Sequence, residues 1–319
     1  MSQARGYAED RAPQATVVIT TKNRRQDTLN AVQSAFAQTV PVEVLVIDDG
    51  STDGTAEAIQ QAFPQARVDR CEQSRGYIVQ RNRGVAMASA PIVFSLDDDA
   101  VFSTSRVVEQ TLAEFDHPRV GAVAIPHIDV HLPPVRRPVC RSPDGLCAVP
   151  MYVGCAHALR RDLFLHLGGY REFFFHQGEE MDYCLRMLCA GYITRLGRAD
   201  PIHHFVSPKR DNQRIVVYGV RNILLYSWYN VPMPYLPVRM LGSVINLTRY
   251  HCLKNPHPIW MLKGLWAVPR AILSLPQRRA PVPRVIYRLD RHLARRGAVP
   301  LSEFESILPP LQQGSKARA

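Results

Sequence analysis

The feature that most constrains the fold is an alternation of short apolar runs with helical patterns over the first hundred residues. Ala15–Thr20 and Val42–Ile47 are rich in β-branched residues, which is typical of buried strands. A helical pattern follows each run, and the order repeats through 66–88 before another apolar run at Ile92–Leu96. Strands that alternate with helices at this spacing form right-handed crossovers. We therefore predict an α/β fold with a mostly parallel, Rossmann-like sheet and helices on both faces.

Polar loops follow three of these strands, at Thr20–Arg24, Asp48–Asp53 and Asp97–Asp99. Ligands of open α/β sheets bind at the carboxyl ends of the strands, so the three loops are expected at one ligand-binding edge. Adjacent carboxylates repel unless they are solvated or share a cation, and Asp97 and Asp99 point the same way on an extended backbone. A solvated acidic turn is the simpler interpretation. The three loops together favour a divalent metal that carries phosphate oxygens.

Composition and cysteine usage exclude several other classes of protein. The 319 residues suffice for a full hydrophobic core. Seven scattered cysteines without a CxxC pair support neither a disulfide framework nor a zinc site, and Cys140 and Cys147 are interpreted as spectators in a reducing cytosol. No apolar run reaches the roughly 18 residues of a membrane span, and the polar N-terminus does not resemble a signal peptide. The first turn, Thr20–Arg24, has no glycine, which argues against a dinucleotide-dependent dehydrogenase and a P-loop kinase.

Four stretches in the first hundred residues resemble the inverting GT-A glycosyltransferases of family 2. They are Val17–Arg24, Val46–Thr55, Arg81–Gly84 and Phe94–Asp99, in the family's order and at its spacings. The resemblance extends from about Thr16 to His204. It implies transfer of a sugar from a nucleoside diphosphate sugar to a hydroxyl of a glycan or lipid-linked acceptor, with Mn²⁺ or Mg²⁺ as cofactor. Bacterial rhamnosyl- and galactosyltransferases of cell-wall or polysaccharide biosynthesis are the similar enzymes.

The resemblance also assigns roles to individual residues at the predicted edge. It implies that the nucleotide sugar is bound or supported by Thr20, Arg24, Asp49, Arg81, Asn82, Asp97 and Asp98. Asp99 falls on the last acidic position of the metal-binding motif, and a histidine after the acidic helix completes the metal site. His203 and His204 are adjacent, and we favour His204 because it directly precedes Phe205. For Asp48 and Ser51 a purely structural role in capping a helix is equally compatible.

A second acidic cluster supplies the candidate catalytic base. Glu179, Glu180 and Asp182 open a predicted helix, where the helix dipole alone would favour negative charge. Inversion requires one carboxylate that takes the proton of the attacking hydroxyl. By resemblance Glu180 lies at a position where the family usually has Asp. The additional methylene of Glu moves the carboxylate by about 1.5 Å. Asp182 is the alternative base, and Arg186 is expected to pair with one of these acids.

The last third of the chain differs in charge from the rest. Residues 205–319 hold 18 Lys and Arg against 4 Asp and Glu, a balance of +14. Trp, Leu and Ile interleave with these cations over Leu241–Leu275, as in helices that lie on anionic membranes. An ordinary helical subdomain that packs on the catalytic domain fits the pattern about as well. The membrane interpretation predicts a cytoplasmic enzyme held peripherally on the inner face of the cell membrane.

The sequence thus predicts four segments and leaves one functional alternative. The segments are a disordered leader at 1–14, a GT-A catalytic domain at 15–229, a helical membrane-associating extension at 230–298 and a loose tail at 299–319. The alternative is a catalytically inactive protein that binds nucleotide sugars, which the Glu180 exchange favours. We expect no nucleic-acid partner, because the basic residues are interleaved with Trp, Leu and Pro and form no nucleic-acid-binding motif.

Overall fold

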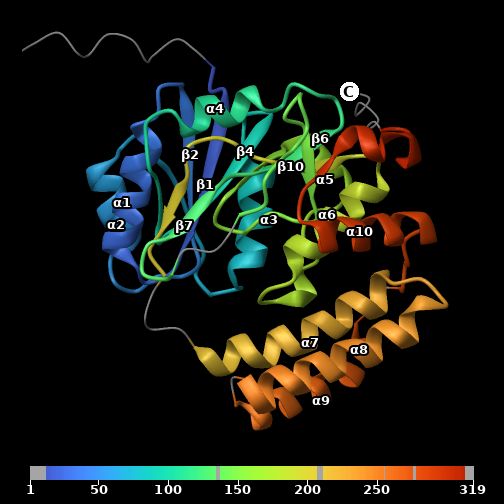
Figure 1. The fold of residues 1–319 in the computed structure, drawn as a ribbon. Coiled ribbons are helices and arrows are strands. Elements are labelled where there is room, and N and C mark those ends of the chain that lie inside the picture. Colours follow the sequence, from blue (N-terminus) through green and yellow to red (C-terminus); the bar gives the residue numbers. More distant parts are fainter. Residues whose placement is uncertain (1–11, 134–136, 207–210, 255, 276–277, 313–319) are drawn as a thin grey trace, which may run out of the picture.

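A computed structural model describes residues 12–133, 137–206, 211–254, 256–275 and 278–312. Figure 1 shows a body built around a sheet and, below it, a layer formed by helices α7, α8 and α9. The predicted α/β class is confirmed.

The central sheet has the strand order β12-β8-β10-β6-β9-β4-β1-β2-β3. Strands β3, β2, β1 and β4 are all parallel, while β9 is antiparallel to both of its neighbours. The strands of this sheet are β1 (Ala15–Thr21), β2 (Val42–Asp48), β3 (Arg67–Arg70), β4 (Ile92–Asp97), β6 (Val120–Ala124), β8 (Cys147–Val149), β9 (His157–Arg160), β10 (Ile193–Leu196) and β12 (Val299–Pro300). A small second sheet consists of β5 (Ala100–Phe102), β11 (Ile202–His204) and β7 (His127–Asp129).

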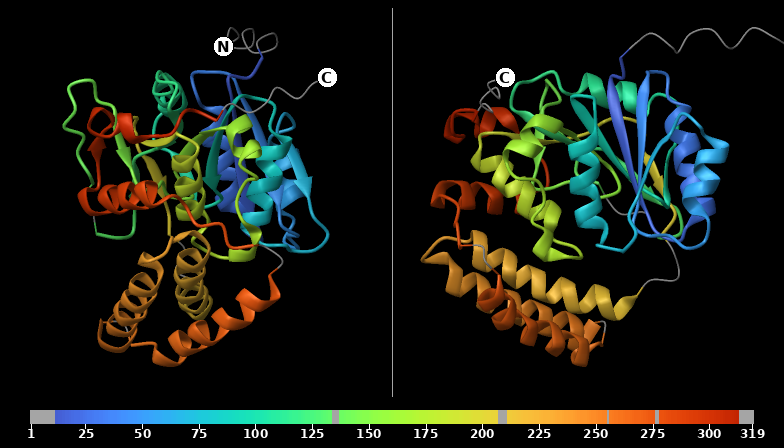
Figure 2. Two further views of the ribbon diagram at one scale, coloured as in Figure 1. Left: turned by 90° about the vertical axis from the view of Figure 1, so that its right-hand side faces the viewer. Right: turned by 180° about the vertical axis from the view of Figure 1, so that it is seen from behind.

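Helices cover both faces of the central sheet, as predicted, with α1 and α2 on one face and α3 on the other (Figure 2). The helices of the body are α1 (Arg25–Phe36), α2 (Thr55–Ala62), α3 (Tyr77–Met87), α4 (Val107–Ala113), α5 (Arg161–His166), α6 (Glu179–Cys189) and α10 (Arg284–Arg296). Those of the lower layer are α7 (Asn212–Asn230), α8 (Tyr235–Arg249) and α9 (Pro258–Ser274), with the short π-helix η2 (Tyr250–Lys254) between the last two.

Strand β1 is an interior strand of the parallel part of the sheet, where it pairs with β2 on one side and β4 on the other. All seven of its residues are buried. Helix α3 packs closely against it at Gly84, where a Cβ atom would collide with Val18 and Ile47. This close approach fixes the position of Arg81, one turn earlier on α3, relative to the end of β4.

The helical layer is held together mainly by contacts of α7 with α9 and α8. A Cβ on Gly264 of α9 would lie 2.7 Å from the carbonyl oxygen of Val217, so the glycine allows these two helices to touch. Helix α10 is not part of the layer, because it packs on α6 and β8 of the body. The extension predicted for 230–298 is therefore divided between the two parts.

The prediction of a loose tail at 299–319 is wrong for residues up to 312. Strand β12 pairs with β8 at the edge of the central sheet, and Leu301, Phe304 and Leu308 are buried. The Gln312 amide also donates to the Ala190 carbonyl at 3.2 Å. The buried apolar residues of this segment recur at every third or fourth position. The segment is too short for this periodicity to have predicted its packing. Residues 313–319, and residues 1–11 of the predicted leader, lie outside the described residues.

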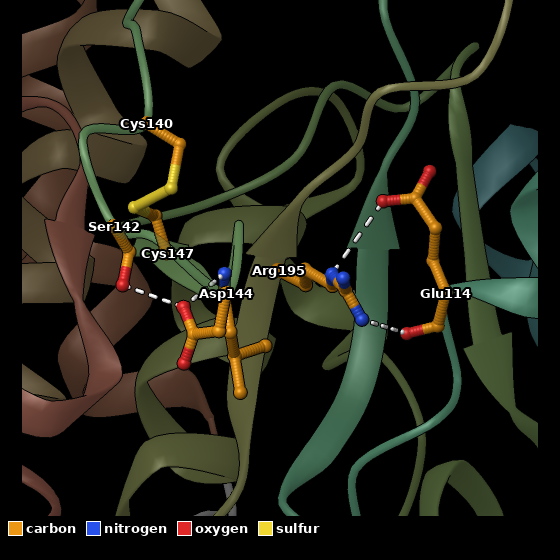
Figure 3. The surroundings of a disulfide bond; sticks show 7 residues. Glu114, Cys140, Ser142, Asp144, Cys147 and Arg195 are labelled. Carbon is orange, nitrogen blue, oxygen red and sulfur yellow. Dashed lines mark hydrogen bonds and ion pairs between the residues drawn. A yellow bond between two sulfur atoms is a disulfide. The ribbon is translucent and has the colours of Figure 1, made fainter.

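The prediction that Cys140 and Cys147 are spectators is also wrong, because they form a disulfide (Figure 3). A turn at 142–145 reverses the chain between them and brings their Cα atoms to 5.6 Å. Asp144 stabilises this turn by accepting hydrogen bonds from the Ser142 hydroxyl at 2.5 Å and the Leu146 amide at 2.9 Å. Cysteine spacing alone did not reveal the pair, since the turn and the start of β8 determine it.

Packing of the C-terminal segment predicts a difference between two neighbouring residues. Phe304→Ala should lower the free energy of unfolding by about 3 kcal/mol, because the ring is only 3% exposed and leaves a cavity. Ile307→Ala is the matched control, and with Ile307 47% exposed its effect should stay below about 1 kcal/mol. Urea unfolding measures both. If both variants lost an equally small amount of stability, the C-terminal segment would not be packed on the body.

Candidate active site

Carboxylates at the end of β4 form the centre of the candidate site. Asp97 ends the strand and lies opposite Thr20 of β1 in the sheet register. The chain then continues into β5, whose residue Ala100 pairs with His204 of β11. His204 in turn lies opposite Asp129 of β7. The small sheet therefore places a histidine and a further carboxylate beside the acidic loop.

His204 is held between two carboxylates. Its Nδ1 lies 2.6 Å from Asp129 Oδ1, and its Nε2 lies 3.3 Å from Asp99 Oδ1. Burial alone would lower the pKa of His204, but the bonds to Asp99 and Asp129 raise it to about 9. His204 therefore lies in the acidic cluster, and its assignment as the metal ligand in preference to His203 stays a prediction. The sequence analysis did not include Asp129, which ends the short strand β7.

Arg24 neutralises part of the acidic loop. Its Nη1 donates to Asp99 Oδ2 at 2.6 Å and to Asp98 Oδ1 at 3.3 Å. Burial raises the pKa of Asp98 to about 7, an effect that Arg24 opposes and Asp99 reinforces. Burial alone would also raise the pKa of Asp99, but the bonds from His204 and Arg24 hold this pKa below the usual value. The first and third predicted loops therefore meet through Arg24.

Three side chains in this region have the spacing of metal ligands. One ligand atom each from Asp97, Cys155 and His204 lies within 4.8 Å of the other two. Asp99, which the sequence assigned to the metal, lies beside His204 and is paired with Arg24. The carboxylate of Asp97 suits Mn²⁺, and the imidazole of His204 is a common metal ligand. Burial raises the pKa of the Cys155 thiol well above its usual value, so this group stays protonated and is the weakest of the three candidate ligands. Cys155 was not predicted as part of the site, because it reaches the site from the turn before β9.

The second predicted loop, Asp48–Asp53, is hydrogen-bonded to the segment at the start of α3 and within itself. Asp49 is 5% exposed and accepts hydrogen bonds from the Ser74 hydroxyl at 2.5 Å and from the amides of Arg75 and Gly76 at 2.7 and 3.0 Å. Gln80 Nε2 adds a further bond at 2.5 Å. Burial would raise the pKa of Asp49, but these bonds lower it. Asp49 thus orders residues 74–76 before α3. The neighbouring Asp48 accepts a hydrogen bond from the Ser51 amide at 2.8 Å, consistent with the structural role.

Arg81 connects the acidic loop to the second acidic cluster. Its guanidinium donates to Asp97 Oδ1 at 2.6 Å and to Glu179 Oε1 at 3.0 Å, and it lies 3.7 Å from Glu180 Oε1. The Tyr77 ring lies 4.7 Å from the guanidinium carbon. Asn82 points elsewhere: it bonds the Tyr170 amide and carbonyl, both at 2.8 Å. Of the two α3 residues, Arg81 therefore lies in the site and Asn82 supports a loop beside it.

Glu179 and Glu180 differ in their surroundings. Glu179 is fully buried, and burial together with neighbouring Glu180 raises its pKa well above the usual value against the effect of Arg81. The side chain of Glu180 is 17% exposed and lies over Gly154. A Cβ on Gly154 would come within 2.6 Å of Glu180 Oε1 and 2.7 Å of Arg81 Nη1. Gly154, which the sequence analysis missed, leaves room for both side chains.

Asp182 is buried among polar partners. Its carboxylate is fully buried and accepts hydrogen bonds from Arg171 at 2.8 Å, Arg186 at 2.9 Å and Asn230 at 2.8 Å. Arg186 also donates to the Leu167 and Gly169 carbonyls at 2.6 and 2.5 Å. The expectation that Arg186 pairs with an acid of this cluster is confirmed. Asp182 joins the acidic helix to the loop before it and to α7.

The loop before the acidic helix is held by α7. Asn222 Nδ2 donates to the carbonyls of Phe174, His176 and Gln177 at 2.7–2.8 Å. Arg221 Nη2 donates to the Phe173 carbonyl at 2.8 Å. Residues Glu172–Phe174 of this loop form a 3-10 turn. The Arg221–Asn222 pair therefore couples the helical layer to the position of Glu180.

Similar proteins define the class of this fold. A mannosyltransferase from Pyrobaculum calidifontis, solved in complex with GDP-Man and Mn²⁺, superposes with a TM-score of 0.55 at 19% identity, over 90% of this chain and 81% of that one. This likeness shows a GT-A transferase fold. Residues 16–168 match the family described as Glycosyl transferase family 2. This part of the chain belongs to the family, as the sequence resemblance indicated.

Two sequence relatives belong to polysaccharide biosynthesis. Succinoglycan biosynthesis protein ExoU from Rhizobium meliloti is 36% identical over 94 residues, which is 28% of each chain. O-antigen chain rhamnosyltransferase WbaN from Salmonella anatum is 27% identical over 231 residues, which is 65% of this chain and 72% of that protein. The match to ExoU thus spans about a quarter of either protein, and that to WbaN most of both.

The environment of Asp182 predicts a role in stability. Asp182→Asn should lower the free energy of unfolding by about 3 kcal/mol, because two arginines lose their buried counter-charge. Asp162→Asn is the matched control: its carboxylate is 93% exposed in an ion pair with Arg161, so its effect should be negligible. Chemical denaturation measures both. A fully stable Asp182→Asn protein that has lost sugar transfer would reassign Asp182 as a catalytic group.

Proposed function

We propose that the protein is an inverting glycosyltransferase that moves a sugar from a nucleoside diphosphate sugar to a hydroxyl of a glycan or lipid-linked acceptor. The observation that carries the proposal is the convergence of a carboxylate and histidine cluster, Arg81 and Glu180 at the carboxyl edge of one sheet. Family membership and the polysaccharide-biosynthesis relatives support the same reaction.

The donor diphosphate is assigned to the acidic loop through a divalent cation. Asp97 and His204 would hold Mn²⁺ or Mg²⁺, with Asp99 and the Cys155 thiol beside them. When bound, the cation stabilises the charge that develops on the leaving diphosphate. Arg24 forms ion pairs with two of the three carboxylates of this loop, Asp98 and Asp99, which lie close together. Thr20 and Asp98 line the same edge, and Asp49 orders the adjoining loop at 74–76.

Glu180 is the proposed base. It is partly exposed, whereas Glu179 and Asp182 are fully buried and bonded to arginines. A base has to reach the acceptor hydroxyl, accept its proton and remain charged beforehand. The Arg81 guanidinium lies 3.7 Å from Glu180 Oε1 and helps to hold this carboxylate in place. The extra methylene of Glu relative to the family's Asp is accommodated above the bare backbone of Gly154.

Replacement of the base tests the reaction. Glu180→Gln keeps the side-chain shape but does not accept a proton, so turnover should fall by a factor of about 10² or more. Binding of the nucleotide sugar should change little, because Glu180 acts on the acceptor. A coupled assay of nucleotide diphosphate release measures turnover, and calorimetry measures donor binding. Full activity of the Gln variant would remove Glu180 from the mechanism.

We further propose that the helical layer attaches the enzyme to an anionic membrane surface. Large apolar side chains are exposed along the outer helices, at Val238, Leu241, Ile245, Tyr250, Leu253, Ile259, Leu262, Trp266 and Leu273. On α9 they recur at helical spacing, with Trp266 and Leu273 each 86% exposed. Lys263 and Arg270 are exposed on the same helix. Among the described residues no helix has the length and hydropathy of a membrane span.

This composition is that of a helix lying in the interface of a bilayer. Burial of one large apolar side chain is worth about 1.5–3 kcal/mol, and each cation near an anionic surface about 1 kcal/mol. Two inserted side chains and two cations therefore suffice for reversible attachment. The anionic inner face of a bacterial cell membrane is the proposed site of action.

Vesicle flotation tests the membrane proposal. The protein should float with vesicles that contain phosphatidylglycerol, and less with pure phosphatidylcholine vesicles or at 1 M salt, because salt screens the charge contribution to within about 3 Å. The double variant Trp266→Ser, Leu273→Ser should remain in the soluble fraction. Ile307→Ser, which removes an exposed apolar residue outside the layer, is the control and should float. Indifference of the wild type to anionic vesicles would contradict the proposal.

A further inference from the structure

Three buried side chains beside the site form a hydrogen-bonded network that the proposed chemistry does not use. Tyr152, His157 and Tyr170 are each at most 2% exposed. The Tyr170 hydroxyl lies 2.8 Å from the Tyr152 hydroxyl and 3.0 Å from His157 Nε2. The other ring nitrogen, His157 Nδ1, lies 3.1 Å from the carbonyl oxygen of Val153. We call these three side chains the histidine network, and it ends on the backbone at Val153.

The direction of each hydrogen bond in the histidine network is fixed. A carbonyl oxygen only accepts, so His157 Nδ1 carries the ring proton and donates to Val153. In a neutral imidazole Nε2 then accepts, so the Tyr170 hydroxyl donates to it and accepts from the Tyr152 hydroxyl. Burial, together with the charge of Arg81, lowers the pKa of His157 to about 3, which keeps the ring neutral. The network therefore has one tautomer and one order of donors.

The network ends on the turn before β9. The carbonyl oxygen of Val153 also accepts from the amide of Ala156 at 3.0 Å, which closes a turn over residues 153–156. His157 is the first residue of β9, so it holds this turn from the strand. Gly154 and Cys155 are the two middle residues of the turn. A hydrogen bond from one buried ring nitrogen thus fixes the backbone on which both residues lie.

The middle of this turn lies against the proposed base. A Cβ on Gly154 would come within 2.6 Å of Glu180 Oε1 and 2.7 Å of Arg81 Nη1, so the turn backbone packs against both side chains. A misplacement of a catalytic group by about 1 Å can lower a rate by about 10². The position of the turn therefore limits where the Glu180 carboxylate can lie.

The other end of the histidine network is anchored on α3. Asn82 donates to the Tyr170 carbonyl and accepts from the Tyr170 amide, both at 2.8 Å. Asn82 directly follows Arg81 in this helix. The Tyr152 ring also stacks on the ring of His157, with centroids 3.9 Å apart and an angle of 12° between the planes. The network thus connects the helix that carries Arg81 to the turn before β9.

We propose that His157 is a positioning residue that holds the turn over 153–156 against Glu180 through its hydrogen bond to Val153. The inference rests on the proposed function, because it concerns the placement of the base. His157 does not touch the reacting groups. Tyr170 and Tyr152 fix its tautomer, and the turn transmits its position to the base. The property required at position 157 is a donor directed at the Val153 carbonyl.

Two substitutions of His157 separate this role from simple packing. An Asn amide nitrogen takes the place of Nδ1, so His157→Asn keeps a donor toward Val153. A Gln amide reaches the place of Nε2, so His157→Gln keeps the bond to Tyr170 and loses the bond to the turn. Both variants lose the ring and its stacking on Tyr152. Both should therefore melt at similar temperatures, below that of the wild type, as thermal melting will show.

The kinetics of sugar transfer give the first readout. His157→Asn should keep kcat within about threefold of the wild type, whereas His157→Gln should lower kcat by about tenfold or more. The KM for the nucleotide sugar should be unchanged in both variants, because the donor site is not displaced. Equal kcat values in the two variants would reduce His157 to a packing residue and overturn the proposal.

The reactivity of the Cys155 thiol gives a second readout, which needs no enzyme activity. Cys155 lies in the turn and is only 2% exposed. Its rate of reaction with the thiol reagent DTNB is obtained by difference from the same protein with Cys155→Ser. This rate should rise about tenfold or more in His157→Gln, because the turn opens more often, and stay close to the wild-type rate in His157→Asn.

Equal Cys155 reactivity in the two variants would also overturn the proposal. The two readouts distinguish its failure from that of the proposed function. If no protein transferred sugar but the Cys155 rates differed as expected, the proposed enzyme would be refuted, while the positioning of the turn by His157 would stand.

Discussion

The site depends on the buried guanidinium of Arg81. This charge is 4% exposed and lies between the carboxylate that ends β4 and the two that begin α6. An unpaired cation at that depth would be very costly, so the three acids stabilise Arg81 while Arg81 keeps them close together. The contact of Gly84 with β1 determines the position of the guanidinium, and Gly154 provides the space around it. Carboxylates from distant parts of the sequence are thus held in one arrangement.

The helical layer continues this arrangement toward the acceptor side. Asn222 of α7 holds the loop before α6 through three backbone carbonyls, so a shift of α7 would move Glu180. On its other side α7 contacts α9, which carries the most exposed apolar residues of the described chain. Attachment to a membrane would therefore orient the base relative to an acceptor presented there.

The sequence predicted the parts of the structure that local patterns determine. Alternating strands and helices specified the parallel strands, and the acidic loop, Arg24 and His204 meet because strand ends meet at one edge. Partners that depend on long-range packing were not predictable. Asp129 and Cys155 reach the site from separate strands and turns, and Asp182 differs from Glu180 only in how α7 and Arg171 enclose it. The Cys140–Cys147 disulfide and strand β12 escaped prediction because β8, to which both are tied, was not recognised as a strand.

The central claim is that the acidic edge binds a nucleotide sugar through a divalent cation. The most direct measurement is thermal melting with a panel of UDP-, GDP- and dTDP-sugars, with and without Mn²⁺. At a ligand concentration 100 times the dissociation constant, binding adds about 2.7 kcal/mol to the free energy of unfolding. We expect at least one nucleotide sugar to raise the melting temperature only when Mn²⁺ is present, and Asp99→Ala to lose this shift. Stabilisation that is independent of the metal and of Asp99, or none with any nucleotide sugar, would contradict the claim.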